Sequence, residues 1–323
     1  MRLARWRRGD RVGEGFVFGD GVCAFPGGAT IAEVLTAGLD AARELERDAA
    51  GSPVIPLAEV TLLAPLVPAA IRDFVAFEEH VEGVSASIDG KSEVVPEWYE
   101  APTFYFTNPH TVRATGDTVR PPHSGRLDFE LELAAVIGGV PGRAGSDLTA
   151  EEAAAHIFGY TVMNDWSARD LQAREMKVRL GPCKGKDFAT TLGPWIVSAD
   201  ELDRYLDEDG FLALRAEVFV NGERIGHDLT SNMGWPFAEL VSYAARDSAI
   251  MPGDVLGSGT VGNGGCLAEL WGRAGELSPS PLGAGDRVRM SIEGIGEIEN
   301  VVGEAVAPPP LRRARDRSRS RAR

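Results

Sequence analysis

The sequence predicts an α+β, β-rich protein with one large body and a small N-terminal domain. Segments with strand-like alternation outnumber helical segments, and they do not alternate with helices as the strands of a doubly wound sheet do. Asn221-Gly222, between two such segments, is a strong signal for a two-residue hairpin. A chain of 323 residues has room for one large domain and a small one.

Changes in composition divide the chain into three parts. Residues 1–65 are expected to form a small β/α domain, with a hairpin over 12–25 and a capping box at Thr30 to Glu33 that opens one helix ending at Gly51. Residues 66–307 form the body. Residues 308–323 begin with three prolines and continue with seven arginines, so we expect a disordered tail.

Within the body, periodicity and turn residues predict the elements in order. Strands are expected at 103–106, 127–137, 158–163 and 193–197, helices at 68–80, 148–158 and 232–245, and hairpins at 214–225 and 286–302. The stretch Gly257 to Gly262 matches GxGxxG, but a dinucleotide site needs a helix opening at that loop. Because residues 267–271 read as a strand, we expect no nucleotide site there.

Composition excludes several classes of function. The net charge is −15 and no apolar run reaches the roughly 18 residues of a membrane span, so neither nucleic acid nor a membrane is an expected partner. The three cysteines, Cys23, Cys183 and Cys266, lie far apart without a CxxC pair. This spacing is typical of reduced thiols in a cytoplasmic protein and argues against a zinc site or a disulfide framework.

The most informative stretch is Leu127 to Ala134, where apolar and acidic residues alternate. In a strand, Glu130 and Glu132 point to one face while Leu131 and Leu133 point to the other. If that face is buried, the two carboxylates need a positive partner, and a hard divalent cation suits oxygen ligands. The alternative is a half-exposed strand with a solvated acidic face.

Two further segments carry polar residues at positions where they could serve a functional site. Asp165 follows a buried strand, where it can cap the next helix or serve a site, and Arg169 and Gln172 are spaced to share a helix face with it. Asp73 and His80 are similarly expected on one face of the helix at 68–80. For His80 the alternative is a surface histidine.

Taken in order, these residues resemble the fumarylacetoacetate hydrolase family over roughly residues 65–303. The resemblance rests mainly on Asn164 to Gln172, with the acidic strand, Gly185 to Phe188 and Leu267 to Leu270 in the family's order. It implies a mixed β-roll catalytic domain behind a small N-terminal domain, assembled as a homodimer.

The resemblance also implies roles for individual residues. The expected ligands of a divalent cation, Mg²⁺ first and Ca²⁺ or Mn²⁺ as alternatives, are Asp73, Glu130, Glu132 and Asp165. The expected catalytic residues are His80 as general base, Glu269 orienting it, and Lys186; the expected substrate-binding residues are Arg169, Gln172, Tyr105 and Thr260. Val75 departs from the pattern, because the family's hydrolases place a tyrosine there.

These roles imply a metal-dependent hydrolase that cleaves a C–C bond in a small β-diketo acid, similar to fumarylacetoacetate or an acylpyruvate, in aromatic catabolism. The alternatives are a decarboxylase or isomerase of a related dicarboxylic acid, such as oxaloacetate or a hydroxymuconate, and a non-catalytic binding protein. Short-form relatives usually carry a glutamate three residues after the histidine. Gly83 at that position favours hydrolysis.

Overall fold

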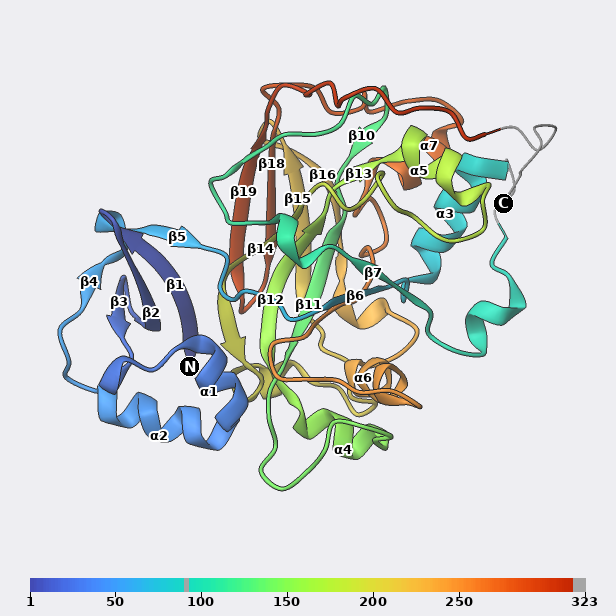
Figure 1. Cartoon of the computed structure of the whole chain (residues 1–323). Helices are drawn as coiled ribbons and strands as arrows, with labels where there is room; N and C mark the ends of the chain where they lie inside the picture. Colours follow the sequence, from blue (N-terminus) through green and yellow to red (C-terminus); the bar gives the residue numbers. More distant parts are fainter. Residues whose placement is uncertain (90–92, 316–323) are drawn as a thin grey trace, which may run out of the picture.

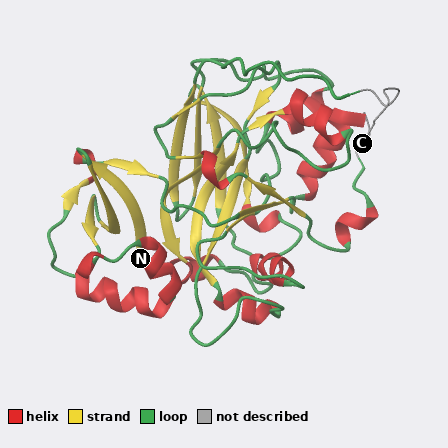
Figure 2. Cartoon of the chain, in the orientation of Figure 1, coloured by secondary structure: helices red, strands yellow, loops and turns green. Residues whose placement is uncertain are grey.

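The computed structural model describes residues 1–89 and 93–315. Within these residues, Figure 1 shows strands packed at the centre of the body, with the N-terminal unit beside it, and Figure 2 shows helices around the strands. The β-rich α+β prediction is confirmed. Residues 316–323 of the expected tail lie outside the described part, and residues 303–315 contain no helix or strand.

The largest sheet has twelve strands in the described residues and runs through both the N-terminal unit and the body. Its main path is β4-β3-β2-β1-β14-β12-β11-β17-β6-β7, while β5 pairs with β1 and β8 with β14. The strands are β1 (Arg2–Arg8), β2 (Arg11–Phe18), β3 (Gly21–Ala24), β4 (Ile55–Pro56), β5 (Thr61–Leu63), β6 (Ile71–Phe74), β7 (Phe104–Thr107), β8 (Val112–Arg113), β11 (Leu131–Ile137), β12 (Ile157–Asp165), β14 (Thr190–Ser198) and β17 (Val255–Gly257).

A five-stranded sheet, ordered β16-β15-β18-β19-β9 in the described residues, packs against β11, β12 and β14. Its strands are β9 (Thr118–Val119), β15 (Arg215–Val220), β16 (Glu223–Leu229), β18 (Arg287–Ile292) and β19 (Gly296–Val302), and a separate pair joins β10 (Leu127–Asp128) to β13 (Ser167–Ala168). The predicted hairpins at Asn221-Gly222 and over 286–302 are confirmed.

Helices cover the edges and ends of the sheets (Figure 2). They are α1 (Ile31–Ala37), α2 (Leu39–Ala49), α3 (Glu78–Asp89), α4 (Ala150–Ala155), α5 (Arg169–Met176), α6 (Phe237–Ala245) and α7 (Leu267–Ala274). Helix α3 packs against α7, and α5 lies at the same end of the molecule (Figure 1). Among the described residues, no helix has both the length and the apolarity needed to cross a membrane.

Strand β11 separates two apolar cores. Leu131 and Leu133 belong to the core shared with the five-stranded sheet, whereas Ala134 and Val136 face the core built with the N-terminal unit. The predicted alternation is therefore present, and every residue of β11 is buried. This burial excludes the solvated acidic face, because Glu130 and Glu132 are both inside the protein.

Three element predictions are wrong. The helix expected at 68–80 is replaced by strand β6, and helix α3 begins only at Glu78. The single helix expected from Thr30 to Gly51 is broken into α1 and α2 at Gly38, which adopts φ +90° and lies so close to Gly139 that a Cβ would sit 2.3 Å from its carbonyl oxygen. The capping box of Thr30 and Glu33 is confirmed. The strand expected at 267–271 is helix α7 instead.

Candidate active site

Five neighbouring strands, β12, β11, β17, β6 and β7, bring distant acids to one place. Gly257 on β17 pairs with Ala134 on β11 and with Asp73 on β6. A Cβ on Gly257 would lie 2.6 Å from Glu132 Oε2 and 2.7 Å from Asp73 Oδ1. The absence of a side chain at Gly257 therefore leaves the space in which two carboxylates from flanking strands meet.

The carboxylates meet in a buried cluster. One oxygen each from Asp73, Glu130 and Glu132 lie within 4.8 Å of one another. Asp73 Oδ1, both oxygens of Glu132 and Asp165 Oδ1 are buried without a hydrogen-bond partner among the described residues. Burial, reinforced by neighbouring carboxylates, raises the pKa of Asp73 and of Glu132 well above the usual range. Unpartnered oxygens in this arrangement fit the donor set of a hard divalent cation.

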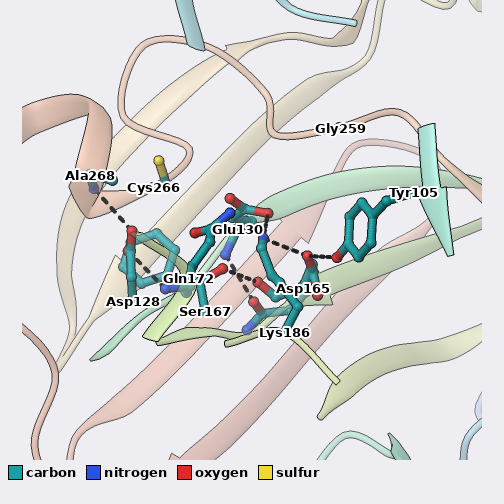
Figure 3. Close-up of polar contacts among 12 residues, drawn as sticks. Tyr105, Asp128, Glu130, Asp165, Ser167, Gln172, Lys186, Gly259, Cys266 and Ala268 are labelled. Atoms are coloured by element: carbon teal, nitrogen blue, oxygen red, sulfur yellow. Dashed lines mark hydrogen bonds and ion pairs between the residues drawn. The ribbon is translucent and has the colours of Figure 1, made fainter. Parts of the chain in front are cut away.

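Glu130 and Asp165 are joined by a buried lysine. Lys186 Nζ donates to Glu130 Oε2 at 2.5 Å and to Asp165 Oδ2 at 2.6 Å (Figure 3). Arg169 Nη2 also forms an ion pair with Glu130 Oε1 at 2.7 Å. Although burial opposes it, Lys186 and Arg169 hold the pKa of Glu130 below its usual range. Glu130 is therefore compensated by protein cations, whereas Asp73 and Glu132 are not.

Tyr105, on β7, completes this side of the cluster. Its hydroxyl donates to Asp165 Oδ2 at 2.5 Å, as Figure 3 shows. Burial raises the pKa of Asp165, while Lys186 and Tyr105 act in the opposite direction. Burial and the nearby Asp165 carboxylate raise the pKa of the Tyr105 hydroxyl well above 10, so Tyr105 remains a hydrogen-bond donor.

His80 lies on α3 beside a second polar group. Its Nδ1 is 3.6 Å from Cys266 Sγ, and ring and carboxylate atoms of His80 and Glu269 lie within 4.8 Å. Burial lowers the pKa of His80 to about 4. Glu269 Oε1 accepts a hydrogen bond from Gly264 N at 3.2 Å, whereas Oε2 is buried and unpartnered among the described residues. Burial raises the pKa of Glu269 to about 7.

Gly83 explains how Glu269 comes so near to α3. A Cβ at this position would lie 2.4 Å from Glu269 Cγ and 3.1 Å from its Cα. Any larger residue there would push α7 away from α3. The glycine noted in the sequence thus allows the close packing of these two helices, which carry Glu269 and His80.

Asp128 is a structural partner that the sequence reasoning missed. It is fully buried; its oxygens accept backbone hydrogen bonds from Leu267 at 2.7 Å and Ala268 at 3.0 Å, and a side-chain bond from Arg169 Nε at 2.8 Å. One carboxylate thereby fixes both the start of α7 and the Arg169 guanidinium. The available signal was an aspartate between apolar residues in a buried strand.

Local geometry differs from the prediction at two points. Asp73 lies on strand β6, so it shares no helix face with His80. Asp165 is the last residue of β12 rather than part of a helix face with Arg169. Arg169 and Gln172 do share the first turn of α5, where Arg169 Nη1 donates to Gln172 Oε1 at 3.1 Å.

These groups open onto a pocket of about 320 Å³. All of the predicted site residues line it except Glu132, Asp165 and Glu269, which are fully buried. Thr260 contributes a hydroxyl that has no partner among the described residues. A larger hollow, about 520 Å³ beside Trp195, is lined instead by charges such as Arg215 and Glu293, which pair with each other on the surface.

Comparisons with known proteins identify relatives of this chain. A family model described as fumarylacetoacetate (FAA) hydrolase C-terminal matches residues 69–303. The chain is 32% identical over 310 residues to fumarylacetoacetase of Arabidopsis thaliana, covering 79% of this chain and 73% of that protein. It is 30% identical over 261 residues to oxaloacetate tautomerase of Bacillus subtilis (strain 168), covering 79% and 77%.

A solved structure of a fumarylacetoacetate hydrolase from Exiguobacterium antarcticum matches with a TM-score of 0.71 at 25% identity, covering 94% of this chain and 99% of that one. Matches to further fumarylacetoacetases span 61% to 66% of those proteins' lengths. The relatives thus include both a fumarylacetoacetate hydrolase and an oxaloacetate tautomerase.

Proposed function

Because the chain belongs to the fumarylacetoacetate hydrolase family, we propose that it is a metal-dependent hydrolase that cleaves a C–C bond in a β-diketo acid such as an acylpyruvate. The observation that carries this proposal is the shared pocket: an imidazole, two cationic side chains and the carboxylates of Asp73 and Glu130 line one space of about 320 Å³, with the buried Glu132 carboxylate beside them.

Asp73, Glu130, Glu132 and Asp165 would hold the cation, for which Mg²⁺ is the first choice and Mn²⁺ or Ca²⁺ the alternatives. When bound, the cation supplies positive charge that polarises substrate carbonyl oxygens. Oxygens of Asp73, Glu132 and Asp165 that have no partner among the described residues support this assignment, because burying an unpartnered carboxylate oxygen is costly.

Side chains of the pocket would orient the substrate's oxygens. Gln172 Oε1 already accepts a hydrogen bond from Arg169, so its amide NH₂ remains free to donate. Lys186 uses two of its three N–H bonds on Glu130 and Asp165, which leaves one for a developing oxyanion. A donor of this kind typically contributes about 3 kcal/mol to transition-state stabilisation.

His80 would be the general base. With Nδ1 facing Cys266, Nε2 is the nitrogen available to take a proton from water. The resulting hydroxide adds to the acyl carbonyl, the C–C bond breaks towards the pyruvate part, and the enolate takes up a proton, so one water yields two acids. Glu269, one carboxylate oxygen of which lies within 4.8 Å of a ring nitrogen, would favour the imidazolium as it forms.

The surroundings of His80 also support a second function. Cys266 rather than Glu269 lies beside His80 Nδ1, and Glu269 Oε1 is held by an ion pair with Arg273 Nη2 at 2.7 Å and by a hydrogen bond from Gly264 N. A tautomerase or isomerase of an oxaloacetate-like acid needs a group that moves a proton, and a decarboxylase needs the enolate left after CO₂ departs to be stabilised and protonated; neither needs an activated water. The tautomerase relative, which matches 77% of its own length, supports this alternative.

A turnover screen separates these functions. Purified protein with Mg²⁺ or Mn²⁺ is offered acetylpyruvate, fumarylacetoacetate and oxaloacetate, and products are identified by NMR. Release of two acids supports the hydrolase, whereas tautomerised product or carbon dioxide supports the alternative. Loss of each activity in His80→Gln is the control that the pocket is responsible. Metal binding without any turnover would leave only a non-catalytic binding role.

A further inference from the structure

The pocket extends from the polar cluster into an apolar region. Val75, Val84 and Thr103 line the pocket and also line a second hollow of about 320 Å³, together with His80. The second hollow continues along Val81, Val95 and Trp98. Each volume is within the roughly 300–1,000 Å³ range typical of small-molecule sites. A substrate held at the carboxylate cluster would therefore reach this second hollow by passing His80 and Val84.

We propose that the group on the far side of the scissile bond is uncharged and apolar, an alkyl or aryl acyl group rather than a second carboxylate. This inference rests on the proposed function, because it takes the carboxylate cluster as the site of the dicarbonyl part. It assigns Val75, Val84, Val95 and Trp98 as the residues that select the acyl group.

The charges around the pocket support an uncharged acyl group. Among the described lining residues of the two hollows, the basic side chains besides His80 are Arg169 and Lys186, and each already contacts two carboxylates. The acidic residue of the second hollow is Glu97, which is exposed. A second substrate carboxylate entering this hollow would meet a like charge and lose hydration, so the site disfavours it.

Trp98 presents an apolar wall. Its indole Nε1, the only polar atom of the side chain, donates to Val75 O at 2.7 Å, and the ring is held against Trp235 with centroids 4.7 Å apart. Because the N–H is satisfied by the protein, the indole has no donor left for a substrate carboxylate. At the other end, Phe104, Met176 and Pro182 add apolar surface to the pocket.

The expected dependence of kcat/KM on acyl length follows from the burial of apolar surface. Each methylene that enters the hollow is expected to raise kcat/KM about fourfold, which corresponds to about 0.8 kcal/mol per buried CH₂ at 1.36 kcal/mol per tenfold. In a series of acylpyruvates from acetyl to hexanoyl, kcat/KM should therefore rise steadily with the length of the acyl group. For the dicarboxylic analogue of the same length, kcat/KM should be at least tenfold lower than for the substrate with the uncharged acyl group.

The test measures kcat/KM for this acylpyruvate series and for dicarboxylic analogues of matched length, in parent protein and Val95→Arg. Val95 is 58% exposed, so the larger side chain has room. The added cation should raise the relative kcat/KM of dicarboxylic substrates at least tenfold. Val12→Arg, at a position 55% exposed on β2 outside both hollows, is the matched control and should not change the ratio.

A second variant, Val84→Phe, should abolish the gain from the longer acyl chains, measured as the ratio of kcat/KM for hexanoylpyruvate to that for acetylpyruvate. Chain-length independence, or a preference of the parent protein for dicarboxylic substrates, would overturn the inference while leaving the hydrolase intact. If no substrate is turned over, the proposed function fails instead. The inference is then decided by calorimetric binding of the same acids with Mg²⁺, where affinity must rise with acyl length.

Discussion

Replacing Glu132 by glutamine separates the cost of burying this carboxylate from its contribution as a metal ligand. Glu132 is fully buried, neither oxygen has a partner among the described residues, and burial beside Asp73 raises its pKa well above normal. Glutamine has nearly the same shape and carries no charge. We therefore expect metal-free Glu132→Gln to be at least as stable as the metal-free parent, an unusual sign for a change in a buried core.

Burial of the Asp73 and Glu132 carboxylates also makes the stability of the protein depend on pH. Ordinary pKa values of Asp73 and Glu132 are 3.8 and 4.5, and both are raised in the folded state. Between the ordinary and the raised values, the folded protein binds more protons than the unfolded chain, so the metal-free parent loses stability as pH rises above about 4. Glu132→Gln removes one of the two groups, and its free energy of unfolding should fall less steeply between pH 5 and pH 8.

Metal binding should make the parent protein more stable than Glu132→Gln, the reverse of the order expected without metal. A cation at 100 times its Kd stabilises the folded state by about 2.7 kcal/mol. With an unfolding entropy of about 2.1 cal/mol/K per residue, or about 0.7 kcal/mol/K for a chain of this size, Tm should rise by about 4 °C. The parent should show this shift with Mg²⁺ or Mn²⁺, and Glu132→Gln should show little of it.

Thermal unfolding is followed by circular dichroism from pH 5 to pH 8, with EDTA and with added cation. It measures the stability of the metal-free proteins, the dependence of that stability on pH, and the Tm shift caused by the cation. Glu208→Gln, an exposed glutamate changed in the same way, is the control and should behave as the parent. The ligand assignment is refuted if Glu132→Gln keeps the full Tm shift. The burial argument is refuted if the metal-free variant is less stable than the parent by more than about 1 kcal/mol.

Three further predictions concern residues around the cluster. His80→Gln should retain cation affinity by calorimetry but lower kcat by about 10²–10⁴-fold, and near-normal kcat would exclude it as the base. Burial lowers the pKa of His80 to about 4 and raises that of Glu269 to about 7, so in Glu269→Gln, which removes the Glu269 titration, kcat/KM should fall only as pH drops towards 4; an acid limb near 6.5 in that variant would contradict this. Asp128→Asn leaves Arg169 with one fewer buried carboxylate and should lower the free energy of unfolding by roughly 3–5 kcal/mol in urea titrations, whereas an unchanged midpoint would show that this ion pair does not stabilise the fold.

Local patterns were sufficient where neighbours in sequence decide the structure. The capping box at Thr30, the Asn221-Gly222 turn and the alternation of β11 all depend on residues a few positions apart, and all three are confirmed. Helix α7 was missed for the opposite reason. Its first turn is fixed by Asp128, whose carboxylate comes from a strand about 140 residues earlier and accepts the backbone N–H groups of Leu267 and Ala268.

The sequence by itself determined the family, the β-rich fold and the order of the acidic, basic and histidine residues, because strand periodicity and motif spacing are properties of the chain alone. Only the tertiary structure decided that Glu130 is neutralised by Lys186 and Arg169 while Asp73 and Glu132 are left uncompensated, and that Cys266 is the group beside His80. The physical reason is that burial and charge compensation depend on distances across strands. Gly257 sets one of these distances, since only a residue without a side chain lets carboxylates from β11 and β6 approach each other above it.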